Sequence, residues 1–124
     1  MAEIRHHAID LRKLRDLRDM LGDDEAVLEV LEVYSTSASE GVQVIRDAME
    51  RRNDEAIGAA AHRLKSSSFA IGAAVLGQLC AELEAAAAAR DWTAIDNARP
   101  AFEEHSARVL SEARLLCGIG VRTA

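Results

Sequence analysis

The fold is decided by residues 60–84, which read AAHRLKSSSFAIGAAVLGQLCAELE. Apolar residues recur at three- and four-residue spacing on both sides of Gly72, as they do along the buried faces of two helices. Gly72 lies where a left-handed residue would end the first of these helices. The stretch therefore predicts two antiparallel helices, over residues 54–70 and 74–89, joined by a very short turn.

Three further helical stripes lie outside this hairpin. A leucine-rich stripe predicts a short helix over residues 10–21, which Gly22 would end. A long apolar stripe, preceded by acidic capping residues, predicts a second helix over residues 24–51. The last stripe predicts a helix over residues 93–117, which Pro100 should kink.

This succession of helices predicts the fold class. Four long helices joined by short polar links favour an all-α fold, an antiparallel up-down four-helix bundle with an additional short N-terminal helix against one end. Aromatic residues make up only 3% of the chain, which argues against sheets. A length of 124 residues suits one hydrophobic core, so residues 1–124 are expected to form a single domain.

Charge and hydrophobicity limit the kinds of partner. The 15 Lys and Arg against 21 Asp and Glu give a formal net charge of −6, which opposes nonspecific binding to nucleic acid or anionic lipid. The N-terminal residues lack the apolar core of a signal peptide, and the alanine run at residues 85–89 is too short to span a bilayer. We expect a cytoplasmic protein that binds neither nucleic acid nor membrane.

The cysteines and most of the histidines do not predict a metal site. Cys80 and Cys117 lie in apolar helical settings without CxxC spacing, which is typical of packing thiols. His6 and His7 fall in a terminus that is expected to fray, and His105 falls on the polar side of the last helix. All three are therefore expected to be surface residues without a bound metal.

His62 differs from these histidines in its surroundings. The residues three and four positions away, and Phe69 one turn further along, share its helix face. Only Phe69 among them is a large apolar residue; the others are Gly58, Ala59, Lys65 and Ser66. The apolar stripe of the same helix points elsewhere, so the imidazole should face solvent. A neutral, accessible imidazole nitrogen can attack an acyl phosphate.

Two charged residues should lie beside His62. Lys65 follows one turn later and would place a cation where phosphoryl oxygens would sit. In a hairpin that turns near residue 73, positions equidistant from the turn lie side by side, which pairs His62 with Glu84. The carboxylate would accept a hydrogen bond from one ring N–H and leave the other nitrogen free to react.

The same stretch resembles the signature of the histidine-containing phosphotransfer (HPt) family. The match centres on His-x-Leu-Lys at residues 62–65, and it extends to Ser67, Ser68, Gly72, Ala73, Leu76, Leu83 and Glu84. The flanking helices follow the family's layout from about Leu11 to Leu116. One departure is Ser66, where the family usually has glycine, because it adds a hydroxymethyl group to the face that a partner approaches.

The resemblance implies a phosphoryl carrier rather than an enzyme. His62 would be the phosphorylated residue, supported by Lys65 and Glu84, and it would relay the phosphoryl group between receiver-domain aspartates of a hybrid histidine kinase and a response regulator. The residues expected to contact these partners are Ala59, Arg63, Ser66 and Phe69. The carrier would be a monomer without a cofactor, because the partner receiver supplies the divalent metal. The sequence has no glycine-rich nucleotide-binding loop, so neither ATP binding nor kinase activity is expected.

Two other functions stay open. A non-phosphorylated adaptor would keep the HPt fold and bind receiver domains without accepting phosphate, which the Ser66 departure would allow. A histidine-kinase dimerisation domain is also built around a phosphorylated histidine. It would be a two-helix unit that pairs with its twin, and four long helical stripes in 124 residues argue against it.

Overall fold

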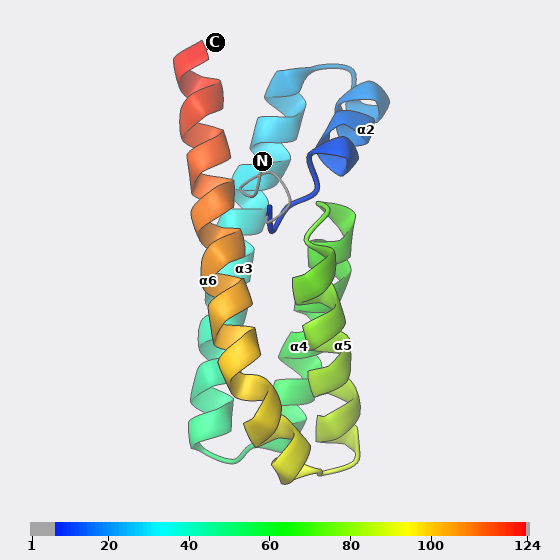
Figure 1. Cartoon of the computed structure of the whole chain (residues 1–124), viewed down its shortest axis with the longest axis vertical. Coiled ribbons are helices and arrows are strands. Elements are labelled where there is room, and N and C mark those ends of the chain that lie inside the picture. The colour runs from blue at the N-terminus through cyan, green and yellow to red at the C-terminus, as the bar shows by residue number, and fades with distance from the viewer. Residues whose placement is uncertain (1–6, 124) are drawn as a thin grey trace.

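Helices account for nearly all of the chain that the structure describes (Figure 1). The structure is a computed structural model that describes residues 7–123, with side chains for residues 7–118. Its helices are α2 (Leu11–Leu21), α3 (Asp24–Glu50), α4 (Asp54–Ala70), α5 (Ala74–Ala88) and α6 (Trp92–Thr123). No strand occurs in residues 7–123, and no helix there is long and apolar enough to cross a membrane. The expectation of an all-helical fold is confirmed.

The four long helices enclose a common core. Helix α3 packs against α4 and α6, and α5 packs against the same two helices. Figure 1 shows that consecutive long helices run in opposite directions, while α2 lies at the upper end beside α3. The side chains between the four helices are at most 1% exposed at Leu31, Ile45, Ile57, Leu83 and Phe102. Burial of such large apolar side chains stabilises the fold by about 1.5–3 kcal/mol each.

Polar caps determine where four of the helices begin. The side chain before each of these helices accepts a hydrogen bond of 2.8–3.1 Å from a backbone N–H of the first turn; these side chains are Asp10, Asp23, Asn53 and Asp91. Gly22 and Gly72 follow α2 and α4 with positive φ values of 105° and 91°. With these signals, helices α2 to α5 begin and end within one residue of the ranges expected from the sequence.

Helix α6 departs most from its expected range. It begins at Trp92 and continues to Thr123, whereas the sequence predicted residues 93–117. Gly118 does not end the helix, because a helical glycine costs only about 1 kcal/mol. Pro100 also lies inside α6, and Figure 1 shows the ribbon bending in the N-terminal part of this helix. Because proline has no N–H, one backbone hydrogen bond is missing there, but the helix continues.

The segment before α2 is held more firmly than the sequence suggested. The backbone N–H groups of Ala8 and Ile9 donate to the Glu112 carboxylate of α6 at 2.8–3.1 Å, and the Ile9 side chain is fully buried. The ring of His7 lies 3.7 Å from the same carboxylate. The expectation of a frayed terminus is therefore wrong from residue 7 onward, and His6 lies outside the described residues. Periodicity could not reveal this contact, because Ile9 is not part of a helical stripe.

A buried polar contact joins α3 to α4. The hydroxyl groups of Tyr34 and Ser68 lie 2.8 Å apart, and both residues are buried. Burial raises the pKa of Tyr34 to about 12, so the phenol stays neutral. Each buried hydroxyl group therefore has a hydrogen-bond partner, and this bond holds α4 against α3.

Two arginines occupy left-handed backbone in the turns at the lower end of the bundle. Arg52 has a φ of 56° and Arg90 a φ of 54°, a conformation that favours glycine. The Arg52 guanidinium lies 4.3 Å from the centre of the Trp92 ring and 2.8 Å from Asp96. Arg90 makes a single ion pair of 3.3 Å with Asp54, and its side chain is 84% exposed. Both arginines therefore adopt an unfavourable backbone conformation. The contacts of the Arg52 side chain offset more of that conformational free energy than the single ion pair of Arg90 does.

We predict that Arg90→Gly leaves the free energy of unfolding unchanged or raises it by up to about 1 kcal/mol. Glycine removes the steric cost of the left-handed conformation, and the exposed ion pair that is lost contributes little. Arg52→Gly should be less stable than Arg90→Gly by about 1 kcal/mol, because it also loses the ring contact. Urea unfolding of both variants tests this prediction, and a greater loss of stability in Arg90→Gly would contradict it.

Candidate functional site

His62, Lys65 and Glu84 form one connected group across α4 and α5. The Nδ1 atom of His62 lies 2.7 Å from Oε2 of Glu84. The ammonium group of Lys65 donates to the other carboxylate oxygen, Oε1, at 2.6 Å. A single carboxylate from α5 therefore holds two side chains that lie one turn apart on α4.

Electrostatics assign the proton on the His62 ring. The hydrogen bond from Lys65, followed by the one from His62, holds the pKa of Glu84 below its usual value. Glu84 is therefore an anion at neutral pH and accepts hydrogen bonds without donating any. Nδ1 must carry the shared hydrogen, which leaves Nε2 with a lone pair in the neutral ring. The His62 side chain is 62% exposed, against 31% for Glu84 and 27% for Lys65, so the imidazole is the open member of the group.

Close packing of the two helices brings Glu84 within reach. A Cβ atom on Gly58 would lie 3.6 Å from the Cβ atom of Ala87, so small residues form the contact one turn beyond the site. On the other side, the chain reverses at Gly72, where a Cβ atom would lie 2.9 Å from the Cβ atom of Lys13. The short turn and the small residues set the register that places Glu84 opposite His62.

A neutral thiol lies under the charged group. Cys80 is fully buried one turn before Glu84, and both cysteines of the chain are free. Burial, with a further contribution from the Glu84 charge, raises the pKa of Cys80 to about 12. Cys80 therefore packs as a small apolar residue and is not a reactive thiolate.

Comparison with known proteins agrees with this arrangement. Residues 29–114 match the family model described as the Hpt domain. The chain belongs to the Hpt domain family. Among solved structures, it is similar to histidine-containing phosphotransfer protein B (HptB) from Pseudomonas aeruginosa PAO1, with a TM-score of 0.75 and 22% sequence identity. The match covers 96% of this chain and 98% of that one. A search of curated proteins finds no match.

Membership in the Hpt family confirms the resemblance inferred from residues 60–84. Members of the family carry out histidine phosphotransfer in phosphorelays. They are phosphoryl carriers rather than kinases. The similarity to HptB concerns the fold, because only 22% of the aligned residues are identical.

The residues expected to contact a partner are accessible in this Hpt domain. Ala59, Arg63 and Ser66 are exposed, and Phe69 is 43% exposed. The Ser66 hydroxyl points back along its own helix, since Oγ donates to the carbonyl oxygen of His62 at 3.4 Å. A partner would therefore meet the Cβ atom of Ser66 rather than an outward hydroxyl group.

Sequence reasoning did not single out Gly77, which lies under the Phe69 ring. A Cβ atom on Gly77 would lie 2.8–2.9 Å from three carbon atoms of that ring. The signal was present, because Phe69 and Gly77 are equidistant from residue 73, as His62 and Glu84 are. The same register therefore explains both contacts.

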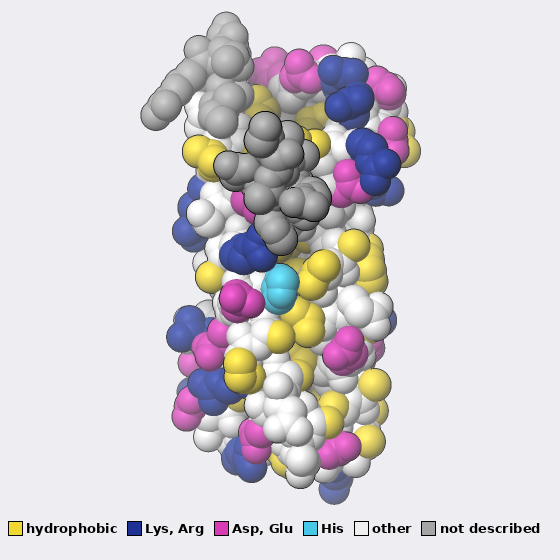
Figure 2. Space-filling view, in the orientation of Figure 1, with side chains coloured by type: hydrophobic (Ala, Val, Ile, Leu, Met, Phe, Trp, Pro, Cys, Tyr) yellow, Lys and Arg dark blue, Asp and Glu magenta, His cyan; other side chains and the backbone are white. Residues whose placement is uncertain are grey.

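The exposed surface of α5 in the Hpt domain carries few charged side chains. Figure 2 shows a mostly hydrophobic and uncharged surface over α5, interrupted by acidic groups, while Lys and Arg side chains gather elsewhere on this face. The exposed residues of α5 are indeed small or uncharged except for one glutamate: Ala74, Val75, Gln78, Glu82, Ala85 and Ala88. This composition suits contact with another protein better than contact with nucleic acid.

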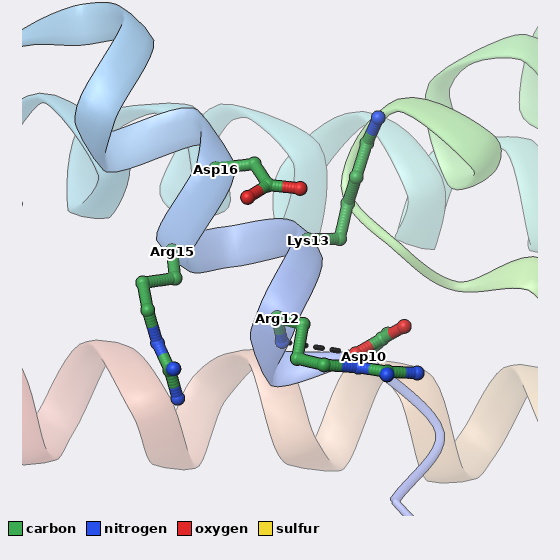
Figure 3. Close-up of a pocket in the computed structure, with 5 residues that line it drawn as sticks. All are labelled: Asp10, Arg12, Lys13, Arg15 and Asp16. Atoms are coloured by element: carbon green, nitrogen blue, oxygen red, sulfur yellow. Dashed lines mark hydrogen bonds and ion pairs between the residues drawn. The ribbon is translucent and has the colours of Figure 1, made fainter.

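A shallow hollow beside α2 does not form a second site. It is lined by residues of a single helix and its cap: Asp10, Arg12, Lys13, Arg15 and Asp16. Figure 3 shows that Lys13 and Arg15 point in opposite directions, so their charges do not converge on one ligand. Arg12 is already paired with Asp10.

The described residues of the Hpt domain contain no group of three or more His, Cys, Asp or Glu side chains able to hold a metal ion. His105 lies 4.0 Å from Glu104, its neighbour in sequence, and His7 lies against Glu112. Neither contact provides a set of metal ligands.

We predict that Glu84→Gln changes how stability depends on acidity. Because the pKa of Glu84 is lowered in the folded state, its carboxylate stabilises the fold above its usual pKa of about 4.5 and loses this effect as the pH falls through the lowered value. The stability advantage of the wild type over Glu84→Gln should therefore shrink between pH 5.5 and pH 3.

Urea unfolding at several pH values measures this difference. Glu82→Gln is the matched control, because Glu82 is an exposed residue of α5 without the contacts to His62 and Lys65. An advantage over Glu84→Gln that stays constant down to pH 3 would show that the carboxylate gains nothing from its two partners.

Proposed function

We propose that this Hpt domain is a phosphorelay intermediate in which His62 accepts a phosphoryl group from one receiver-domain aspartate and passes it to another. The observation that carries the proposal is the contact of Nδ1 of His62 with an ionised Glu84, which leaves Nε2 free in an exposed ring. Family membership supports the same role.

The proposed reaction is a reversible displacement at phosphorus. The Nε2 lone pair attacks the phosphorus atom of the partner's aspartyl phosphate, and the bond from phosphorus to the aspartate oxygen breaks. The carboxylate leaves with the electron pair, and an N–P bond forms at His62. The Nδ1 hydrogen stays on the ring, where the negative charge of Glu84 stabilises the electron-poor imidazole. The reverse sequence delivers the group to a second receiver, and each receiver would supply the divalent metal.

Lys65 has two roles in this proposal. Its ammonium group holds one oxygen of Glu84, which orients the other oxygen toward His62. An ammonium group has three donors, so a second hydrogen is available for a phosphoryl oxygen bound to Nε2. Lys65 would thus support the ring before transfer and the negative charge after it.

The proposed partners are receiver domains, reached through the exposed surface around His62. Ala59 and Ser66 present small side chains that allow close approach, while Arg63 adds a cation next to His62. Phe69 continues the surface toward the α4–α5 turn. The Ser66 side chain should change how closely a receiver fits, compared with the glycine usual in the family.

Further parts of the proposal concern the whole chain. We take the four long helices to be the antiparallel up-down bundle of one Hpt domain, acting as a monomeric carrier without ATP binding, without a cofactor of its own and without binding to nucleic acid or membrane. A cytoplasmic location agrees with the buried free thiol of Cys80. A non-phosphorylated adaptor is the alternative, since Ser66 narrows the approach to His62.

We predict that isolated receiver domains, charged with radiolabelled acetyl phosphate, transfer label to the wild type but not to His62→Ala. The label should be acid-labile and alkali-stable, as expected of a phosphohistidine. Binding of receivers without any labelling of the wild type would instead support the adaptor.

We further predict that Lys65→Ala slows acceptance of phosphate by about tenfold or more without unfolding the bundle. The matched control is Lys13→Ala, which removes the other lysine of the chain and keeps the Cβ atom that packs near Gly72. Rapid-quench kinetics at saturating receiver would measure the rate, and equal rates for Lys65→Ala and wild type would remove Lys65 from the mechanism.

A further inference from the structure

Phe69 is the most accessible of the four aromatic residues of the chain. Tyr34 and Phe102 are buried, and Trp92 is half-buried beneath the guanidinium group of Arg52. Phe69 is 43% exposed on α4. Exposing the apolar surface of a phenylalanine to water is unfavourable. Packing of the bundle core therefore does not explain why a phenylalanine occupies position 69.

Gly77 determines the height at which the Phe69 ring lies. Carbon atoms Cε1, Cδ1 and Cζ of the ring lie 2.8–2.9 Å from the position that a Cβ atom on Gly77 would occupy. Real Cβ atoms do not approach other carbons so closely, so any other residue at position 77 would push the ring outward. One side of the ring therefore lies against Gly77 of α5, and 43% of the Phe69 surface is exposed.

The ring lies on the same face of α4 as His62. The two residues are seven positions apart, which is close to two full turns and about 10 Å along the helix axis. A stable protein interface covers about 800 Å² on each partner, equivalent to a disc of about 16 Å radius. An interface of this size centred on His62 would therefore extend over Phe69.

We propose that Phe69, seated on Gly77, is the aromatic anchor that a receiver domain binds while it exchanges phosphate with His62, and that Gly77 is a positioning residue for this anchor. The inference rests on the proposed function. A flat aromatic ring that is already held on one side loses little conformational entropy on binding, which is typical of residues that dominate interface affinity.

A receiver is favoured over a second copy of this chain by continuity with His62. The anchor and the phosphoacceptor share one helix face, so a second copy seated on Phe69 would cover the exposed imidazole ring. The neighbouring residues Ala70 and Ala74 are exposed and small, so a partner can reach the ring from the side of the turn.

The test is a double-mutant cycle on receiver affinity. Dissociation constants for isolated receiver domains are measured by titration calorimetry with wild type, Phe69→Ala, Gly77→Ala and the double variant, and thermal unfolding confirms that each variant is folded. Leu115→Ala is the control, because Leu115 is 62% exposed on α6. Phe69→Leu adds a folded variant that keeps an apolar side chain but lacks the flat ring. First-order phosphate transfer at saturating receiver is recorded for each.

We expect Phe69→Ala to raise the dissociation constant by about tenfold, and Gly77→Ala and Phe69→Leu by about threefold, while Leu115→Ala has no effect. Gly77→Ala should have no further effect once Phe69 is alanine. Transfer within the saturated complex should stay within about twofold of wild type, unlike in Lys65→Ala.

Several results would overturn the inference. The first is an unchanged receiver affinity in Phe69→Ala. The second is a Gly77→Ala effect on receiver affinity that is the same whether residue 69 is phenylalanine or alanine. The third is a wild-type dimer, seen in sedimentation measurements, that Phe69→Ala dissociates. A wild type that binds receivers but takes up no label would overturn the phosphotransfer proposal alone, because the affinity cycle would still decide the role of Phe69. A wild type that binds no receiver would overturn both.

Discussion

The site depends on one carboxylate that crosses from α5 to α4. Glu84 bonds His62 with one oxygen and Lys65 with the other, so the group exists only while the two helices keep one register. A shift of one residue along α5 would turn the carboxylate away from His62 and leave Nδ1 without its acceptor. The reversal at Gly72 and the small side chain contacts between the helices therefore have chemical consequences, because they decide which ring nitrogen is available for reaction.

The remainder of the bundle holds that register. Helices α3 and α6 flank the hairpin, and the hydroxyl pair of Tyr34 and Ser68 fixes α4 from its buried side. Residues 8–10 link α6 to the turn between α4 and α5. The backbone N–H groups of Ala8 and Ile9 donate to Glu112 of α6, and the N–H group of Asp10 donates to the carbonyl oxygen of Gly72. The imidazole thus projects from a helix that contacts on several sides hold in place.

The sequence predicted those features that follow from periodicity and local chemistry. The helical stripes, the caps and Gly72 define four of the five helices closely, and counting outward from the turn pairs His62 with Glu84. Contacts that depend on three-dimensional packing were missed. Nothing in the local sequence shows that Ile9 enters the core or that Glu112 binds the backbone before α2. The length of α6 was underestimated because glycine weakens a helix without ending it.

The central claim is that Glu84 fixes the tautomer of His62, and ¹⁵N NMR of the imidazole tests it most directly. In wild-type protein at a pH where the ring is neutral, the account predicts a protonated Nδ1 and an Nε2 with a free lone pair, and Glu84→Ala should return the ring to a mixture of tautomers. A wild-type spectrum dominated by the tautomer with the proton on Nε2 would contradict the account, because the nitrogen that faces a partner would then have no lone pair to offer.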